Sequence, residues 1–437
     1  MRKEERGINQ SINQPITKST NRKMKKNIYL LLMILMSAAM SVSAQDYPYD
    51  IDFYDFADYS KAKIVFDKDS SSFRKLHVKL DSMIRYGKSS LSIVQLGASH
   101  TQADIFSGQM RQRLQTLHPG LIGARRFVFP YKMTKTNNPT NYIIKYSGTW
   151  TSCRNVEYRK TCELGISGAS ATTTDPNASL AITMNPNNPI QYDFNEVKVF
   201  TAPFANMYDI VPAGEMGAYT VTRVDSLGYI DFKFAKYQTV ASFRLMKNSE
   251  EQHSFTLYGF SLENDNPGIT YHSIGINGAS LISWLRCQHF ARQLQLLKPD
   301  WILILLGTND GYVTNFNPER FYSGYVDLIS RIKQYCPDIV ITFVVPNDCY
   351  LYRKRPNPAT EEQEKQVLRL VAKYHESMFS VYDCMGGFGS SKVWAERGFM
   401  AADKVHMSVA GYKLCANMLF NAFLRTYDNY LDAEKKK

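Results

Sequence analysis

Ser99 stands where a serine side chain can serve as a nucleophile. It follows an apolar run over residues 91–96 and the turn Gly97-Ala98, and a segment with helical periodicity comes after it. A serine between a buried strand and a helix lies at the carboxyl edge of an α/β sheet, and its N–H lies at the positive end of the helix dipole. A serine in this position is more often a helix N-cap, so a nucleophile also requires a base and a group that orients the base.

Asp403 and His406 can supply the orienting acid and the base. Among the eight histidines only His406 has an aspartate three residues before it, and the pair directly precedes the last helical segment. Asn309 follows the apolar run 301–306 within Gly-Thr-Asn-Asp, where its side-chain amide can donate to an oxyanion. Taken singly, an Asp–His pair is typical of a surface ion pair, and an Asn-Asp sequence is typical of a turn. The hypothesis of serine catalysis therefore depends on these residues together.

The elements that must position these residues form two α/β segments. The first is predicted to contain a helix over 71–85, a strand over 91–96 and a helix over 105–117. The second begins after residue 268 and is predicted to contain a helix over 281–297, a strand over 300–306, a helix near 319–335, a strand over 339–345, a helix near 360–378, a strand over 379–382 and a helix over 408–427. Continuous apolar strands of this kind are typical of a parallel sheet that is buried on both faces.

A β-rich segment separates the two α/β segments. Apolar and polar residues alternate over 197–199, 230–234 and 241–245, with Asn, Pro and Gly between such runs, which predicts an antiparallel β-sandwich. The simplest architecture is one α/β domain with a β-domain inserted after its first strand and helix. The predicted parts are an N-terminal extension with a signal peptide (1–44), the first part of the α/β domain (45–119), the inserted β-sandwich (120–265) and the second part of the α/β domain (266–437).

The N-terminus has the pattern of a secretory signal peptide. Lys25 and Lys26 precede an apolar run over 28–40, and Ser-Val-Ser-Ala then ends at Ala44, where cleavage is expected. The run is shorter than the roughly 20 residues of a spanning helix, which disfavours an uncleaved membrane anchor. We therefore expect an exported protein of the periplasm or cell surface with no membrane span after cleavage, and we interpret residues 1–23 as an extension upstream of the start.

The net charge of +12 does not indicate a nucleic-acid partner. Residues 1–44 hold eight basic and two acidic residues, which leaves 44 basic against 38 acidic residues in the rest of the chain. No stripe of Lys and Arg with interleaved aromatics stands out, and the balance permits a mild attraction to an anionic cell-wall polymer. The sequence has no His-Glu-x-x-His and no Cys-x-x-Cys motif, so we expect no metal and no cofactor.

Seven cysteines are present, an odd number. Cys153 and Cys162 lie nine residues apart in a polar segment and could pair in an oxidising compartment. The others are expected to be buried small hydrophobes, namely Cys287, Cys336, Cys349, Cys384 and Cys415.

The order of the blocks resembles that of the SGNH (GDSL-type) hydrolase family. Strand–Ser–helix is followed by Gly-x-x-Gly before a helix, strand–Gly-Thr-Asn-Asp, and Asp-x-x-His before the final helix. The resemblance implies a flavodoxin-like three-layer α/β fold with Ser99 as nucleophile, Asp403 as orienting acid and His406 as general base. It also implies an oxyanion hole formed by the N–H groups of Ser99 and Gly278 and the side chain of Asn309.

Two details qualify this resemblance. The Gly-x-x-Gly block occurs twice, but only Gly278 is followed by a predicted helix and, 31 residues later, by Asn309, so we interpret Gly168 as a turn in the β-domain. The family usually has Gly-Asp-Ser in its first block, whereas this chain has Gly97-Ala98-Ser99, a change that could loosen the loop around the nucleophile.

His100 narrows the resemblance to one subfamily, because Gly-x-Ser-His resembles a variant found in bacterial peptidoglycan O-acetylesterases. Members of that subfamily carry a β-sandwich carbohydrate-binding module between the first and second blocks, which implies that the inserted segment is such a module. His100 could contact substrate or could equally be a helix-start histidine bound by a neighbour. Some aromatic residues of the insert could stack on sugar rings, although most are expected to be core or ordinary surface: Trp150, Tyr192, Tyr208, Tyr219 and Tyr258.

The resulting hypothesis is an exported serine esterase that removes O-acetyl groups from a cell-wall glycan, with peptidoglycan as the favoured substrate, through an acyl-enzyme on Ser99. The same triad would serve an O-acetyltransferase or a general carbohydrate acetylesterase. A non-catalytic glycan-binding protein is a third alternative, against which the complete set of Ser, Asn, Asp and His argues. The expected partner is an acetylated glycan and not a nucleic acid.

Overall fold

The computed structural model describes residues 48–436. The chain separates into two units, Met1–Asp50 and Ile51–Lys437, and the fold reported below is that of the second unit. The predicted signal peptide lies outside the described residues. Within residues 48–436, no helix combines the length and the apolar character needed to cross a bilayer.

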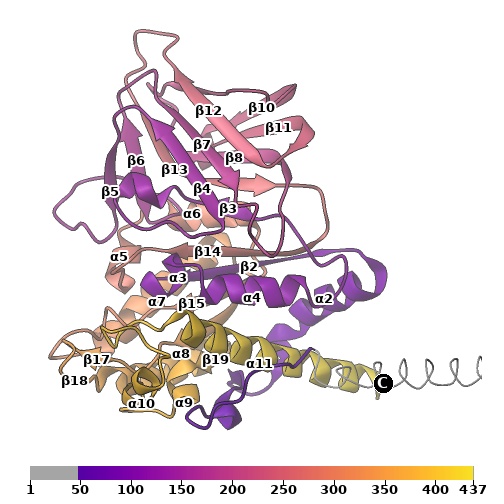
Figure 1. The fold of residues 1–437 in the computed structure, drawn as a ribbon, viewed down its shortest axis with the longest axis vertical. Helices are drawn as coiled ribbons and strands as arrows, with labels where there is room; N and C mark the ends of the chain where they lie inside the picture. The colour runs from indigo at the N-terminus through magenta and orange to yellow at the C-terminus, as the bar shows by residue number, and fades with distance from the viewer. Residues whose placement is uncertain (1–47, 437) are drawn as a thin grey trace, which may run out of the picture. The chain divides into compact units, whose positions relative to one another are not determined.

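A six-stranded sheet forms the centre of the α/β domain (Figure 1). Its strands lie in the order β1 (Val65–Phe66), β19 (Ser377–Ser380), β16 (Val340–Val345), β15 (Trp301–Leu305), β2 (Ser90–Gly97) and β14 (Gly268–Gly275). All neighbours are parallel except β1, which pairs antiparallel with β19. The predicted α/β fold is thereby confirmed. The sequence patterns did not indicate β14, which pairs along the whole length of β2 and forms the edge of the sheet.

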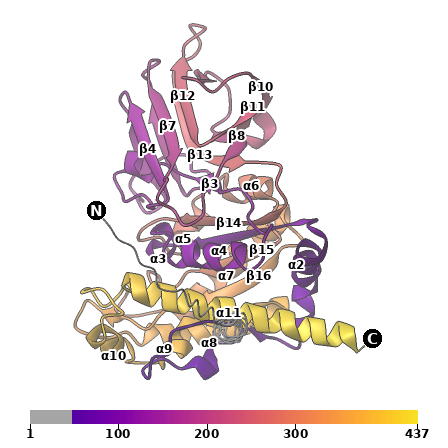
Figure 2. The same cartoon turned by 45° about the vertical axis from the view of Figure 1, so that its right-hand side comes forward.

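Helices cover both faces of this sheet and complete three layers (Figures 1 and 2). One group consists of α2 (Arg74–Tyr86), α4 (Phe106–Gln115) and α11 (Val409–Lys435), and the other of α5 (Leu281–Leu285), α6 (Phe290–Leu294), α7 (Pro318–Tyr335) and α8 (Ala359–Tyr374). Side chains of β15 point alternately to the two groups. Trp301 stacks on Phe423 of α11 with ring centroids 4.9 Å apart, whereas Ile302 and Ile304 belong to the core that includes residues of α5, α7 and α8.

Several boundaries differ from the sequence-based prediction. The helix predicted to end at residue 427 continues to Lys435, and the strand predicted over 379–382 is Ser377–Ser380. The single helix predicted over 281–297 is interrupted between α5 and α6, because the backbone N–H of His289 donates to the Leu164 carbonyl (3.1 Å) and the Gln288 side chain accepts from the Leu164 N–H (3.1 Å). Periodicity does not reveal such bonds to a distant segment. The helix predicted over 360–378 ends at Tyr374, where His375 adopts a left-handed backbone (φ 54°) and β19 follows.

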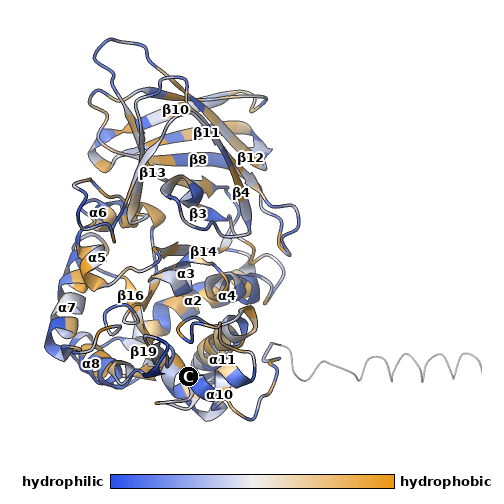
Figure 3. Ribbon diagram, turned by 60° about the vertical axis from the view of Figure 1, so that its left-hand side comes forward, coloured by the Kyte–Doolittle hydropathy of each residue, from blue (hydrophilic) through white to orange (hydrophobic). Residues whose placement is uncertain are grey.

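Two antiparallel sheets form the inserted domain between α4 and β14 (Figure 1). The larger sheet has the order β10 (Tyr219–Val224), β11 (Tyr229–Gln238), β8 (Phe194–Thr201), β13 (Phe255–Glu263), β6 (Ala169–Thr173) and β5 (Thr151–Arg154), with β3 (Arg126–Val128) also on β13. The smaller sheet has the order β4 (Tyr142–Ser147), β7 (Ser179–Met184), β12 (Val240–Met246) and β9 (Asp209–Pro212). Phe243 of β12 stacks on Phe260 of β13 in the core between them. Figure 3 shows polar and apolar residues interleaved along these strands. In β11 the burial alternates over residues 229–234, as the alternating sequence pattern predicted.

Short elements follow β16 and β19. A hairpin is formed by β17 (Tyr350–Leu351) and β18 (Arg355–Pro356), and the helices α9 (Val381–Met385) and α10 (Ser391–Glu396) follow β19. The four-residue helix α3 (Ser99–Gln102) directly follows β2.

A buried ion cluster joins the inserted domain to the α/β domain. Asp104 accepts hydrogen bonds from Arg111 of α4 (2.6 Å), from Arg125 (3.1 Å) and from the Asn141 amide (2.5 Å). Burial alone would raise the pKa of Asp104, but the two guanidinium groups hold this pKa below its usual value. Because Arg125 and Asn141 belong to the start of the inserted segment, the cluster fixes that segment beside α3 and α4.

Candidate active site

Ser99, His406 and Asp403 form a continuous chain of hydrogen bonds. His406 Nε2 lies 2.7 Å from Ser99 Oγ, and His406 Nδ1 lies 2.7 Å from Asp403 Oδ2. Ser99 is the first residue of α3, directly after β2, and the other two residues lie in the turn before α11. The structure therefore brings Ser99 next to His406, 307 positions later in the chain, with Asp403 on the other side of the ring. The arrangement is that of a serine nucleophile, a base and an orienting acid.

The turn from β2 into α3 depends on a glycine. A Cβ atom on Gly97 would lie 2.2 Å from Thr101 Oγ1 and 2.8 Å from the Leu305 carbonyl oxygen, so a side chain cannot be accommodated there. Ala98 is buried in the core, and its carbonyl accepts the backbone N–H groups of Thr101 and Gln102. Ala98 thus occupies an apolar position in this chain, and the close approach at Gly97 holds Ser99 at the end of the strand.

Asp403 holds His406 in place through several hydrogen bonds. Its Oδ1 accepts the backbone N–H groups of Val405 (2.9 Å) and His406 (3.0 Å), while Oδ2 faces the imidazole ring. Partial burial favours the neutral acid, but the hydrogen bonds from His406 and Val405 outweigh it and lower the pKa of Asp403. The carboxylate therefore stays ionised beside the ring, where it fixes Nδ1 as a donor and leaves Nε2 to accept from Ser99.

The predicted oxyanion donors line the same pocket as Ser99 and His406, a hollow of about 450 Å³. Gly278 adopts φ +83°, a conformation that favours glycine, and Asn309 donates one amide hydrogen to the Ala279 carbonyl (2.9 Å). Among residues 48–436, the second amide hydrogen of Asn309 has no hydrogen-bond partner. Gly168 adopts φ +72° in a turn of the inserted domain and does not line this pocket, as the sequence analysis expected.

His100 lies next to the pocket but is not among its lining residues. Its ring is buried, with Nδ1 2.7 Å from the Tyr412 hydroxyl and Nε2 3.2 Å from Thr308 Oγ1. Burial of the ring and, to a smaller extent, the charge of the neighbouring His406 lower the pKa of His100 to about 3, so the ring is neutral. Both nitrogens have protein partners, whereas a substrate contact, the first of the two alternatives for His100, would need a ring nitrogen free to face the pocket. Its contacts correspond to the alternative, a helix-start histidine bound by its neighbours.

Several pocket residues were not predicted from the sequence. Asn137 reaches the pocket from the inserted segment, just after the 3-10 helix Tyr131–Thr134, and Asn277 and Tyr412 complete the wall. Asn137 lies in a polar stretch without periodicity or motif. Asn277 lies inside the Gly-x-x-Gly block and could have been noticed there.

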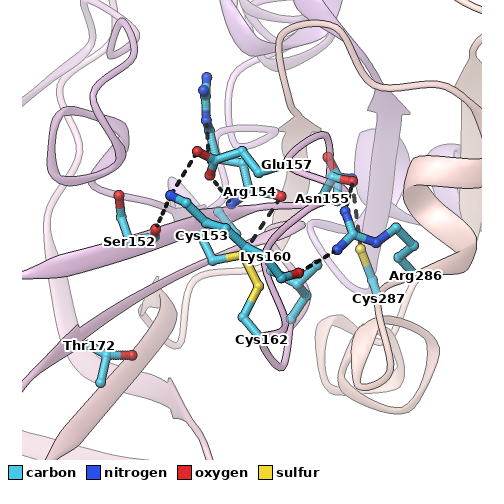
Figure 4. Close-up of a disulfide and its surroundings, with 12 residues drawn as sticks. Ser152, Cys153, Arg154, Asn155, Glu157, Lys160, Cys162, Thr172, Arg286 and Cys287 are labelled. Atoms are coloured by element: carbon cyan, nitrogen blue, oxygen red, sulfur yellow. Dashed lines mark hydrogen bonds and ion pairs between the residues drawn. A yellow bond between two sulfur atoms is a disulfide. The ribbon is translucent and has the colours of Figure 1, made fainter.

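A disulfide closes a loop of the inserted segment (Figure 4), and this loop contacts α5 where the Tyr158 hydroxyl lies 2.7 Å from Ser283 Oγ. Cys153 and Cys162 are bonded, as the spacing suggested, and the other five cysteines are free and buried as expected. Arg286, directly after α5, donates to the carbonyls of Asn155 (2.7 Å) and Lys160 (3.0 Å) in this loop. The loop therefore supports the helix that begins just after Gly278.

The aromatic residues considered for sugar stacking are mostly core residues. Tyr192, Tyr208 and Tyr258 are buried, and Trp150 packs against the core of the inserted domain. Tyr219 is the exposed member of the set. Within residues 48–436, no group of three or more His, Cys, Asp or Glu side chains is arranged to hold a metal ion.

Comparisons with known proteins agree with this fold. Residues 248–414 match the model of the GDSL-like lipase/acylhydrolase family. A structure of a peptidoglycan O-acetylesterase is 22% identical, covers 84% of this chain and 99% of its own chain, and has a TM-score of 0.68. The lipase/acylhydrolase from Enterococcus faecalis is 20% identical, with 35% of this chain and 74% of its own covered and a TM-score of 0.28.

An acetyl xylan esterase is 16% identical, with 36% of this chain and 82% of its own covered and a TM-score of 0.28. No curated protein sequence matches the chain. The match over 84% of the chain extends beyond the α/β domain into the inserted sheets. The chain is therefore a GDSL-type esterase, a member of the GDSL/SGNH hydrolase family in which an inserted domain of antiparallel β-sheets interrupts the α/β domain.

Proposed function

We propose that this chain is an exported esterase that removes O-acetyl groups from a cell-wall glycan, with peptidoglycan as the substrate. The observation that carries the proposal is the chain of two 2.7 Å contacts from Ser99 through His406 to Asp403, at the wall of an open pocket. The fold shared with a peptidoglycan O-acetylesterase over 84% of this chain supports the choice of substrate.

In the proposed reaction, Ser99 Oγ attacks the carbonyl carbon of the acetyl ester, and His406 Nε2 takes the serine proton. The tetrahedral oxyanion is held by the N–H groups of Ser99 and Gly278 and by the Asn309 amide. Collapse breaks the bond to the sugar oxygen, which leaves with the proton from His406. Water then attacks the acetyl-serine with His406 as base again, and acetate and the free serine are released.

The test compares acetate release from O-acetylated peptidoglycan, O-acetylated xylan and an aryl acetate. We expect peptidoglycan to be the best substrate, and we expect Ser99→Ala to abolish release from all three. Ser249→Ala, at an exposed loop position of the inserted domain, is the matched control. Equal rates on all three substrates would contradict the cell-wall assignment, and full activity of Ser99→Ala would contradict the serine mechanism. Transfer of acetyl to an added glycan in place of acetate release would identify an acetyltransferase.

Export rests on the sequence pattern of residues 25–45. We propose cleavage after Ala44, so the mature protein should begin at Gln45. Mass spectrometry of the protein recovered from the producing cell envelope measures this N-terminus, and an intact Met24 would contradict cleavage.

A further inference from the structure

Two asparagines from distant parts of the chain lie side by side in the wall of the pocket that contains Ser99. Asn137 comes from the start of the inserted segment, and Asn277 directly precedes Gly278. The Asn277 Nδ2 group donates to Asn137 Oδ1 at 2.7 Å. Their juxtaposition plays no part in the hydrolytic steps described above, and it places two side-chain amides next to the nucleophile.

The buried side chain of Gln102 determines how both amides point. The backbone N–H of Asn277 donates to Gln102 Oε1 (2.7 Å), and the backbone carbonyl of Asn137 accepts from Gln102 Nε2 (2.9 Å). Backbone groups can only donate or only accept, so these two bonds assign the oxygen and nitrogen of Gln102. Gln102 Nε2 also donates to Asn137 Oδ1 (3.3 Å), which orients Asn137, and that oxygen in turn orients Asn277.

The outcome is one unused donor and one unused acceptor. The Asn277 Nδ2 group donates its hydrogens to Asn137 Oδ1 and to Thr136 Oγ1 (3.0 Å). Asn137 Oδ1 accepts from Asn277 and from Gln102. Asn137 Nδ2 and Asn277 Oδ1 have no hydrogen-bond partner within residues 48–436. A secondary amide offers the complementary pair, because its carbonyl can accept from Asn137 and its N–H can donate to Asn277.

The charge of the pocket favours a neutral ligand group. No Lys, Arg, Asp or Glu is among the described lining residues, which are Ser99, Ala103, Asn137, Asn277, Gly278, Thr308, Asn309, Val405, His406 and Tyr412. A carboxylate or an ammonium group would therefore lack a partner of opposite charge. A hydroxyl group could meet either asparagine, but only an amide presents a fixed donor and a fixed acceptor together.

We propose that Asn137 and Asn277 bind the N-acyl amide of an amino sugar that carries the O-acetyl ester. The assignment rests on the proposed carbohydrate esterase function and specifies its substrate class as N-acylated amino sugars. The pair acts in substrate selection: a sugar with a hydroxyl in place of the amide leaves one asparagine group without its partner when the pocket is filled.

The experiment uses two soluble esters that differ at one position, 6-O-acetyl-N-acetylglucosamine and 6-O-acetylglucose. The measured quantity is the ratio of their kcat/KM values, which cancels general effects of a variant on catalysis. We expect the wild-type ratio to favour the amide sugar by about tenfold or more, and Asn137→Asp, which loses the Nδ2 donor, to bring the ratio close to one. Asn138→Asp is the matched control, because it introduces the same charge one residue away at a position that does not line the pocket. Its ratio should equal that of the wild type.

A wild-type ratio near one, or an unchanged ratio in Asn137→Asp, would overturn the proposal. Binding without turnover separates this proposal from the proposed function. Titration of Ser99→Ala protein with N-acetylglucosamine and with glucose should show a preference for the amide sugar that the added Asn137→Asp change removes. That preference would support the subsite even if no acetate were released from peptidoglycan, and its absence would overturn the subsite even if acetate were released.

Discussion

Asp403 holds His406 at two points, because one carboxylate oxygen accepts the backbone N–H of His406 at 3.0 Å and the other lies 2.7 Å from its ring Nδ1. The backbone contact fixes where the residue lies, and the ring contact fixes how the imidazole is rotated. Both follow from the three-residue spacing, which lets the aspartate side chain reach forward over the turn to His406. The imidazole of His406 thus lies beside Ser99 with an orientation that the local sequence sets.

Replacing Asp403 by Asn separates these two contacts. The Asn side-chain oxygen can still accept the backbone N–H of His406, but its NH₂ group would face the ring and favour the wrong tautomer. We expect kcat on an aryl acetate to fall by roughly 10²- to 10⁴-fold with little change in KM. Stopped assays of initial rate measure this, and thermal unfolding verifies that the variant is folded. Wild-type kcat in a folded Asp403→Asn protein would show that Asp403 does not orient the base.

Removing the Asn309 amide tests the oxyanion hole. The side chain is fixed by its bond to the Ala279 carbonyl, so it is already in position when charge develops on the substrate oxygen. Because that charge exists only in the transition state, Asn309→Ala should lower kcat by roughly 10²- to 10³-fold and change KM much less. An effect mainly on KM would instead place Asn309 in ground-state binding.

The disulfide should support both stability and activity. Cys153–Cys162 closes a short loop of sequence separation 9, and its loss should lower the free energy of unfolding by about 2 to 3 kcal/mol. Because Arg286 bonds to the loop, we also expect a drop of a few fold in kcat as α5 and the neighbouring Gly278 lose support. Urea unfolding and aryl acetate assays of the Cys153→Ser/Cys162→Ser variant measure both effects.

Reductant is the control for this prediction. It should lower the free energy of unfolding of the wild type toward that of the double variant. The free energy of unfolding of the variant should not change, since the other five cysteines are free. Equal stability of oxidised wild type and variant would contradict the assigned role of the loop.

Asp310 should make stability depend on pH. Its Oδ1 accepts the Leu281 N–H (3.0 Å), its Oδ2 is buried without a partner within residues 48–436, and burial raises the pKa of Asp310 to about 7. The folded state therefore holds this proton more tightly than the unfolded state, in which the pKa is near its ordinary value of 3.8. Stability is lost as pH rises from about 4 to about 7, with a slope of at most about 1.4 kcal/mol per pH unit.

Asp310→Asn keeps the oxygen that accepts from Leu281 and removes the titration. We expect the free energy of unfolding of the variant, minus that of the wild type, to increase from pH 4 to pH 7 and to stay constant above. Urea titrations at a series of pH values measure this difference, in which other titrating groups cancel. A difference independent of pH would show that Asp310 does not titrate in this window.

Much of the α/β domain was predictable from local patterns. The continuous apolar runs became β15 and β16 because strands buried on both faces need apolar residues at every position. β14 was not predicted because its sequence contains the polar residues His272 and Ser273. In the folded protein these residues hydrogen-bond to Ser92 and Ser107, respectively. The interruption between α5 and α6 was not predicted for a similar reason, since Gln288 and His289 hydrogen-bond to Leu164 of the inserted domain.

For the site, the sequence by itself determined the order and types of the groups proposed to react. The three-residue spacing of Asp403 and His406 is a local feature, and local geometry alone makes its turn. Gly97 is visible in the sequence, but the close approach that requires a glycine there also comes from Leu305 of the neighbouring strand. Only the tertiary structure decided that Asn137 meets Asn277 across 140 positions and that His100 is enclosed by Tyr412 across 312. Contacts between segments so far apart depend on how the sheets and helices pack, and no local pattern in the chain encodes which polar side chain will face which.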